Sequence, residues 1–275
     1  MKPRLTVVSP KTAPGARSPI LEVRSLAKVF RSAHAPVKVL EEIDIAAAAG
    51  ELICILGPSG CGKSTLLKIL SGFIPPSAGD MRLNDRPITR PGPDRCVVFQ
   101  EDALFPWLTV AENIAFGLRG KGKDRRAVRR EVDRFLSLVG LTPYRDYLPR
   151  EISGGMKQRV ALARVLILEP RVLLMDEPFA SLDAQAREEM QNLLLSLWAK
   201  LSHTILFVTH DVVEAVTLAD RILVMDKNPG RIRAEIPAAL DRPRQRDDPE
   251  FIRFCRMLHD GLRGGFGEGN LPGWP

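Results

Sequence analysis

Residues 52–65 read LICILGPSGCGKST, and this stretch decides the fold. The unbroken apolar run LICIL predicts a strand buried on both faces, and a helix is expected to begin near Lys63. Between them, GPSGCGKST (57–65) matches the phosphate-loop pattern in the strand–loop–helix context that this pattern requires. Its glycines free the backbone to turn N–H groups inward, and the amino end of a helix attracts negative charge. The stretch therefore predicts a nucleotide triphosphate site in an α/β fold.

The polar residues of this loop have separate expected roles. Lys63 should reach the β- and γ-phosphates, and the hydroxyl of Ser64 should complete the shell of a Mg²⁺ ion. The other positions expected to surround the phosphates are Gly57, Pro58, Ser59, Gly60, Cys61, Gly62 and Thr65.

A second stretch, VLLMDEP (172–178), supplies the acids that such a site needs. An apolar strand that ends in two acids places carboxylates at the carboxyl edge of a parallel sheet, where ligands bind in open α/β folds. Asp176 is the expected carboxylate on the Mg²⁺ side. Glu177 should point elsewhere and orient or deprotonate a water for attack on the γ-phosphate. The alternative is that the two acids merely end a strand.

The rest of the chain alternates short apolar runs with helical segments, which predicts an α/β layered fold with a mostly parallel sheet. The expected strands are 52–56, 96–99, 172–175, 205–208 and 221–225. The expected helices begin after Lys63 and cover 124–139, 154–169, 184–201 and 211–219. Residues 101–158 lack good strands and predict a mostly helical insertion.

A further loop, ISGGMKQR (152–159), also opens a predicted helix and also suits an anion. Extended to ISGGMKQRVALARVLILEPRVLLMDEPFASLDA (152–184), it resembles the signature helix, Walker B strand and D-loop of ATP-binding cassette (ABC) ATPases. Ser153 lies 23 residues before Asp176 and His210 lies 34 after it, as in that family. The resemblance covers about residues 20–240. It implies a P-loop NTPase (RecA-like) core with a helical subdomain over about 101–158.

The resemblance implies a head-to-tail homodimer and explains why two anion loops occur. Each ATP would lie between the phosphate loop of one subunit and the Ser153, Gly154 and Gly155 of the other, so that binding and hydrolysis drive closing and opening. Asp183 matches the D-loop residue at the dimer seam.

The family pattern assigns three more residues to the nucleotide. Gln100 matches the Q-loop glutamine, which touches Mg²⁺ or the attacking water, and His210 matches the switch histidine, which contacts the γ-phosphate. Phe30 aligns with the aromatic residue that stacks on adenine, with a plain core residue as the alternative. The signature departs from the usual pattern at Ile152 and Met156, and Met156 removes a possible polar contact.

A transporter ATPase without membrane helices needs partners, and no run of 18 uncharged apolar residues occurs here. The stretches LFPWLTVAENIAFGL (104–118), THDVVEAVTLADRILVM (209–225), NPGRI (228–232) and DRPRQRDDPEF (241–251) resemble the nitrate/sulfonate/taurine importer ATPases. This implies separate permease subunits, indirectly a solute-binding protein, and a peripheral place on the cytoplasmic face of the inner membrane. Large apolar anchors for the permease are expected in the insertion, or these residues pack its core: Phe105, Trp107 and Leu108.

Other functions are weighed against transport. The importer could carry another solute, or the ATPase could act on ribosomes or nucleic acid, although such proteins usually have two fused cassettes or a long coiled-coil insertion. A scaffold with a dead site is disfavoured because Lys63, Asp176, Glu177 and His210 are all present.

Composition sets the remaining limits. The 275-residue chain carries a net charge of +7, but the basic run at 119–134 fits the solvated face of an amphipathic helix, and no groove-reading motif predicts specific nucleic-acid binding. Four cysteines without a CxxC pair disfavour a zinc site or a disulfide framework. Residues 1–19 are Pro-rich, basic and without a secretory apolar region, and predict a disordered tail. Residues 241–275 form a C-terminal extension whose glycine-rich end, 261–275, is expected to be loose.

Overall fold

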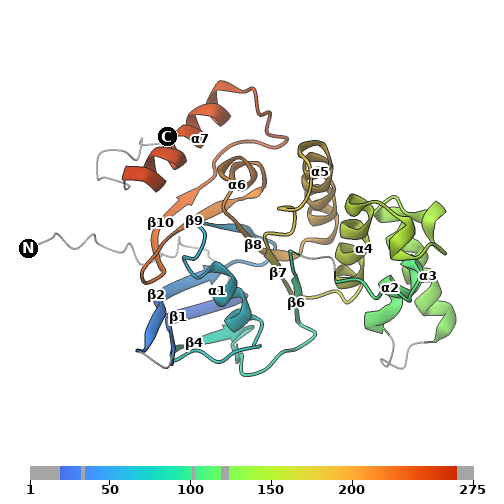
Figure 1. The fold of residues 1–275 in the computed structure, drawn as a ribbon, viewed down its shortest axis with the longest axis horizontal. Helices are drawn as coiled ribbons and strands as arrows, with labels where there is room; N and C mark the ends of the chain where they lie inside the picture. Colours follow the sequence, from blue (N-terminus) through green and yellow to red (C-terminus); the bar gives the residue numbers. More distant parts are fainter. Residues whose placement is uncertain (1–18, 32–34, 101–102, 119–123, 265–275) are drawn as a thin grey trace, which may run out of the picture.

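The computed structural model describes residues 19–31, 35–100, 103–118 and 124–264. Its centre is a six-stranded sheet in the order β10–β9–β3–β8–β7–β6 (Figure 1). The pairs from β9 through β3, β8 and β7 to β6 are parallel, and the β9–β10 pair is antiparallel. The strand bounds are β3 Leu52–Leu56, β6 Arg95–Val98, β7 Val172–Asp176, β8 Thr204–Thr209, β9 Arg221–Asp226 and β10 Arg231–Pro237.

The central strands are buried on both faces, which is why their sequences are continuously apolar. In β3, Leu52, Cys54 and Leu56 face one hydrophobic cluster, whereas Ile53 and Ile55 face the other. All five predicted strands are present, each within one residue of the expected bounds at either end.

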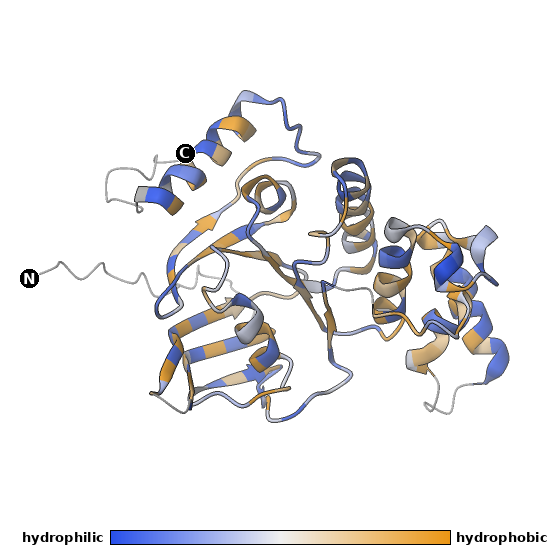
Figure 2. Cartoon of the chain, viewed as in Figure 1, coloured by the Kyte–Doolittle hydropathy of each residue, from blue (hydrophilic) through white to orange (hydrophobic). Residues whose placement is uncertain are grey.

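A second, antiparallel sheet in the order β2–β1–β4–β5 was not predicted. Its strands are β1 Leu21–Phe30, β2 Val37–Ala47, β4 Ala78–Leu83 and β5 Arg86–Pro87. These strands alternate apolar and polar residues, because only one face is buried (Figure 2). Helix α1 (Lys63–Leu70) packs in the same cluster as residues of both sheets and so joins them.

Helices α5 (Ala184–Leu201) and α6 (Val212–Leu218) contribute to the cluster on the other face of the central sheet. Helix α7 (Pro249–Gly264) contacts α6 from outside. Its Phe251, Phe254 and Leu258 are buried at helical spacing. The expectation of a loose end was wrong for residues 261–264, because they form the last turn of this amphipathic helix.

The predicted helical insertion projects to one side of the molecule (Figure 1). Its described part contains α2 Val110–Ala115, α3 Arg125–Leu138 and α4 Gly154–Leu166, with short 3₁₀ turns at Phe116–Leu118, Thr142–Tyr144 and Pro149–Glu151. Helix α4 ends three residues earlier than expected, and Glu169, just before Pro170, has a positive φ of 54°. Among the described residues, no helix is long and apolar enough to cross a bilayer. The predictions for residues 1–18 and 265–275 lie outside the described part of the chain.

Candidate nucleotide-binding site

The phosphate loop connects β3 to α1 as predicted, and its backbone requires glycine. Gly60 and Gly62 have φ angles of 81° and 102°, in the left-handed region that favours glycine. A Cβ on Gly57 would lie 2.7 Å from the carbonyl oxygen of Met225, so this position is also restricted. No side chain caps the amino end of α1, which leaves its first N–H groups available to an anion. The loop therefore fits a chain of phosphates.

Lys63 is the charged residue at the centre of this loop. Its side chain is only 4% exposed, and its Nζ donates to the carbonyls of Gly57 at 2.7 Å and Pro58 at 3.1 Å. The same ammonium lies 3.6 Å from Oε1 of Glu177. Of the other predicted loop residues, Ser59 is exposed and Thr65 is half-buried in α1. Cys61 is buried, and this burial raises the pKa of its thiol.

Asp176 and Ser64 meet at the carboxyl edge of the central sheet. The Ser64 hydroxyl donates to Oδ1 of Asp176 at 2.9 Å. Burial raises the pKa of the Asp176 carboxyl, while the Ser64 hydrogen bond acts in the opposite direction. A hydroxyl and a carboxylate oxygen side by side are ligands that Mg²⁺ prefers, so this pair fits the ion expected from the sequence.

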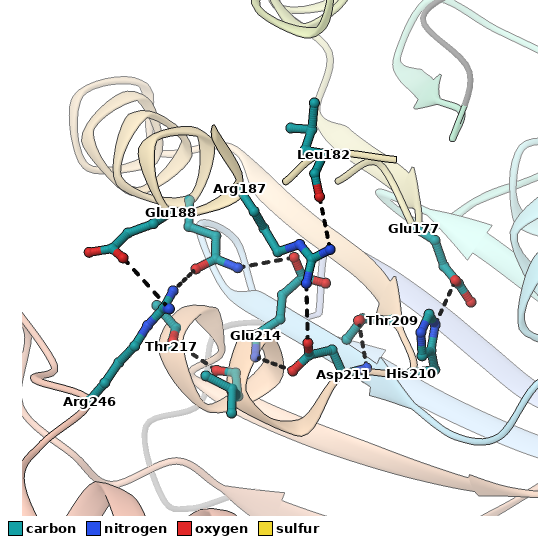
Figure 3. A network of polar contacts seen from close by, with 12 residues as sticks. Glu177, Leu182, Arg187, Glu188, Thr209, His210, Asp211, Glu214, Thr217 and Arg246 are labelled. Atoms are coloured by element: carbon teal, nitrogen blue, oxygen red, sulfur yellow. Dashed lines mark hydrogen bonds and ion pairs between the residues drawn. The ribbon is translucent and has the colours of Figure 1, made fainter. Parts of the chain in front are cut away.

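Glu177 turns away from Asp176, as expected. Its backbone has a positive φ of 44°, and its N–H donates to the carbonyl of Val208 at 3.0 Å. Its Oε2 lies 2.7 Å from Nδ1 of His210, which follows the end of β8 (Figure 3). Because a carboxylate only accepts hydrogen bonds, Nδ1 carries the proton in this pair.

The Ser-Gly-Gly loop forms a second site away from the phosphate loop. Ser153 is the N-cap of α4 and accepts from the Met156 N–H at 3.3 Å. A cavity of about 480 Å³ lies here, with Ser153, Gly154, Gly155 and Asp183 in its wall. Among the residues that line this cavity, none belongs to 57–65. The structure therefore brings together two sets of predicted nucleotide contacts but does not join them within one chain.

Gln100 and Phe30 are the two remaining residues that the sequence assigns to the nucleotide. Gln100 is exposed just beyond β6, and its carbonyl accepts from Nε2 of Gln158 on α4 at 3.2 Å. Phe30 ends β1 and is 40% exposed, which argues against the plain core role that its sequence left open. The ammonium of Lys28 lies 5.0 Å from the centre of its ring.

Comparison with known proteins identifies the family. Residues 40–180 match the family described as ABC transporter. The chain belongs to the ABC transporter family. It is an ABC ATPase, the ATP-binding subunit type of that family, with a P-loop NTPase α/β fold.

Relatives of this ABC ATPase cover most of its length. A putative ATP-binding protein of Brucella abortus biovar 1 (strain 9-941) is 50% identical over 77% of this chain and 83% of its own. The nitrate import ATP-binding protein NrtD of Synechococcus elongatus is 41% identical over 93% of this chain and 99% of its own. The bicarbonate transport ATP-binding protein CmpD of the same species is 44% identical, with coverages of 87% and 88%.

Solved structures agree with the fold. The cbiO1 protein of Clostridium perfringens, part of the ABC transporter complex cbiONQ, superposes with a TM-score of 0.75 at 28% identity. That match covers 90% of this chain and 96% of cbiO1. A dimeric ATP-binding cassette in a post-hydrolysis state with ADP and Pi has a TM-score of 0.70 at 27% identity, covering 80% of this chain and all of its own.

The ABC ATPase also contains polar residues near the site that sequence reasoning missed. A small cavity of about 50 Å³ adjoins Glu177 and His210, and its wall includes Arg187, Asp211 and Glu214. Arg187 donates to the Leu182 carbonyl at 3.0 Å and lies 3.6 Å from Oδ2 of Asp211 (Figure 3). The sequence offered a signal for the two acids, because Asp211 and Glu214 follow His210 within four residues, but none for Arg187.

The aromatic residues of the insertion form an exposed cluster on this ATPase. The Phe105 ring centre lies 5.7 Å from that of Trp107 and 4.2 Å from that of Phe116. Trp107 is 72% exposed, whereas Leu108 is half-buried. A tryptophan this exposed does not pack the core of the insertion, which leaves the anchor role open for it.

Proposed function

We propose that this ABC ATPase powers an importer for a small solute as a head-to-tail homodimer with two shared nucleotide sites. The observation that carries the proposal is the separation of the two anion loops. The cavity beside Ser153 and Asp183 has no residue of the phosphate loop in its wall. A second copy, turned about a twofold axis, supports both sites at once by facing its Ser153 loop to the first copy's Lys63.

Within each shared site, the phosphate loop binds the nucleotide and the residues at the strand ends act on it. Lys63 and the free N–H groups of α1 hold the phosphates, with Phe30 against the adenine. Ser64, Asp176 and Gln100 would hold Mg²⁺. Bound there, the ion would neutralise charge on the β- and γ-phosphate oxygens.

Hydrolysis requires a base for the attacking water, and Glu177 fits this role. Its carboxylate lies at the end of β7, held by the Nδ1–H of His210 at 2.7 Å and close to the Lys63 ammonium. His210 orients this carboxylate and, in the closed dimer, contacts the γ-phosphate. Asp183 and residues 153–155 complete the site from the other subunit.

The transported solute and the partners follow from relatives rather than from this chain. The names of NrtD and CmpD refer to nitrate and bicarbonate, both small oxyanions. We therefore expect a solute of the nitrate, sulfonate or taurine type, permease subunits that contact the exposed aromatic cluster, and a solute-binding protein upstream. In this proposal the cassette, residues 20–240 with its insertion at 101–158, lies on the cytoplasmic face of the membrane, with 241–275 as an extension.

A complementation experiment tests the shared site. Lys63→Ala and Ser153→Ala each damage both sites of their own homodimer. Mixed together, they form heterodimers with one intact site and one doubly damaged site. We expect phosphate release to rise well above that of either variant alone. A mixture as inactive as its components, with heterodimers present by native mass spectrometry, would show that the loops do not share a nucleotide.

A further inference from the structure

After β10 the chain returns across α6 before α7 begins. This crossing segment, DRPRQRDD (241–248), carries three arginines, Arg242, Arg244 and Arg246, which we call the arginine strap. Each of them contacts polar groups of the cassette. Because α6 begins directly after His210 and Asp211, whatever fixes α6 also bears on the proposed switch histidine.

Two strap residues hold the carboxyl end of α6. The Arg244 guanidinium donates to the carbonyls of Val216 and of Ala219, the latter at 2.7 Å. Arg242 donates to the Leu218 carbonyl and pairs with Asp220 at 2.6 Å. The last carbonyls of a helix lack partners within it, so these guanidinium groups take the place of a cap.

The third strap residue reaches the other end of α6 through two buried side chains. Arg246 donates to Oε1 of Gln191 at 2.8 Å, and the Gln191 amide donates to Oε1 of Glu214 at 3.1 Å. Gln191 is 1% exposed and Glu214 is 5% exposed. Arg246 also lies 3.7 Å from Glu188, one helical turn before Gln191 on α5.

Glu214 connects this chain of contacts to the proposed catalytic pair. It lies in the first turn of α6, where its N–H donates to Oδ1 of the N-cap Asp211 at 3.1 Å. Its carboxyl group also shares a hydrogen bond with the hydroxyl of Thr209, the residue before His210. Glu214, His210 and Glu177 line the same small cavity.

Arg246 and Glu214 together orient the Gln191 amide. A glutamine amide presents oxygen on one side and NH₂ on the other. With the guanidinium bonded to its oxygen, the NH₂ must face Glu214. Without Arg246, the amide oxygen loses its donor, and Gln191 is held at this end only by its bond to Glu214.

We propose that Arg246 is a positioning residue for ATP hydrolysis, acting through Gln191 and Glu214 to hold the amino end of α6 and His210. The C-terminal segment thereby sets the hydrolysis rate of the cassette, although it does not touch the nucleotide. This inference rests on the proposed roles of His210 and Glu177.

The test compares Arg246→Ala with wild type in the full chain, by steady-state phosphate release over a range of ATP concentrations. We expect kcat to fall about three- to tenfold, with the KM for ATP within about twofold of wild type. Arg246→Lys should recover part of the loss, because an ammonium can also donate to Gln191. The matched control is Arg233→Ala, which removes a similarly exposed, ion-paired arginine from β10 and should leave kcat unchanged.

A double-variant cycle checks the route. Arg246→Ala combined with Gln191→Ala should be no slower than Gln191→Ala alone, because both act along one path. Three outcomes would each overturn the proposal. They are a wild-type kcat in a folded Arg246→Ala protein, a change in KM alone, and additive losses of kcat in the double variant. Glu177→Gln and His210→Ala belong in the same assay. If they retain activity, the proposed site itself is wrong; if they lose it while Arg246→Ala does not, only the strap inference fails.

Discussion

Glu177 and Asp176 are neighbours in sequence, yet their carboxylates serve different partners. The sequence predicted this divergence, because successive side chains along a strand point to opposite sides. It could not predict that Glu177 has a positive φ of 44°, which directs its carboxylate to Nδ1 of His210. That detail depends on β7 and β8 being adjacent in the sheet, which no local pattern reveals.

Replacing the Glu177 carboxylate tests its role as the base. Glu177→Gln should lower phosphate release about 100-fold or more, because the amide cannot accept the proton of the attacking water. Nucleotide binding, measured by a fluorescent ATP analogue, should persist because Lys63 and the loop are unchanged. The control is Glu131→Gln, an exposed, ion-paired glutamate on α3. Phosphate release near the wild-type rate would contradict this role.

Glu214 predicts a pH-dependent stability difference. Its burial raises the pKa of its carboxyl, with Asp211 acting in the same direction and hydrogen bonds from Thr209 and Gln191 opposing. Because the folded pKa lies above the unfolded one, ionisation disfavours the folded state, and this cost appears as the pH rises through that range. Glu214→Gln avoids the cost. Its free energy of unfolding relative to wild type should therefore increase as the pH rises from about 4, the usual range of a glutamate carboxyl, through the raised pKa of Glu214. Urea unfolding at several pH values measures this, and a constant difference would contradict it.

Helix starts were the best predicted features of the elements, because polar caps mark them in the sequence. Ser153 and Asp183 each accept a backbone N–H at the start of a helix that was predicted from its first residue. The antiparallel sheet was missed for two reasons. Its strands lack the continuous apolar runs that mark the central strands, and register shifts between Val23 and Val29 break the alternation of period two in β1. Helix α7 was missed although Phe251, Phe254 and Leu258 have helical spacing, because the glycines that follow favoured a loose end.

Two helix caps allow stability to be separated from function. Asp183 caps α5 beside the Ser153 cavity, and Asp124 caps α3. Asp183→Ala and Asp124→Ala should each lower the free energy of unfolding by about 1 kcal/mol, as loss of a cap does. Only Asp183→Ala should also lower phosphate release, since its side chain borders the proposed dimer site. Equal phosphate release from the two variants would remove Asp183 from that site.

At the level of the whole cassette, the sequence predicted which residues contact the nucleotide, whereas their positions relative to one another come from the structure. The order of Lys63, Ser153, Asp176 and His210 was readable from motifs. The separation of the Ser153 cavity from the phosphate loop was not, because it depends on how α4 and the central sheet are placed. In the proposed homodimer, a second subunit would bring the two loops together.

The exposed aromatic cluster predicts where the membrane subunits bind. Trp107→Ser should abolish co-purification of the permease from detergent extracts, because it removes a large apolar anchor from the cluster. Phosphate release by the isolated subunit should stay within about twofold of wild type, since Trp107 lies outside the nucleotide site.

The matched control for this experiment is Ile252→Ser, which removes an exposed apolar side chain from α7. Retained permease with Trp107→Ser would place the contact elsewhere. Co-purification of wild-type protein with ribosomes or nucleic acid instead of a permease would contradict the importer assignment.

Tryptophan fluorescence can report on the arginine strap and on the exposed aromatic cluster. Trp198 on α5 donates its indole N–H to the Gly50 carbonyl at 2.9 Å, and the Arg242 guanidinium lies 4.6 Å from its ring. Trp107 is the solvated one of the pair. A variant that retains only Trp198 would report undocking of the strap as a red shift in emission, and one that retains only Trp107 would report permease docking as a blue shift. Stopped-flow traces of the two variants, recorded under the same conditions, would then show which of the two events comes first.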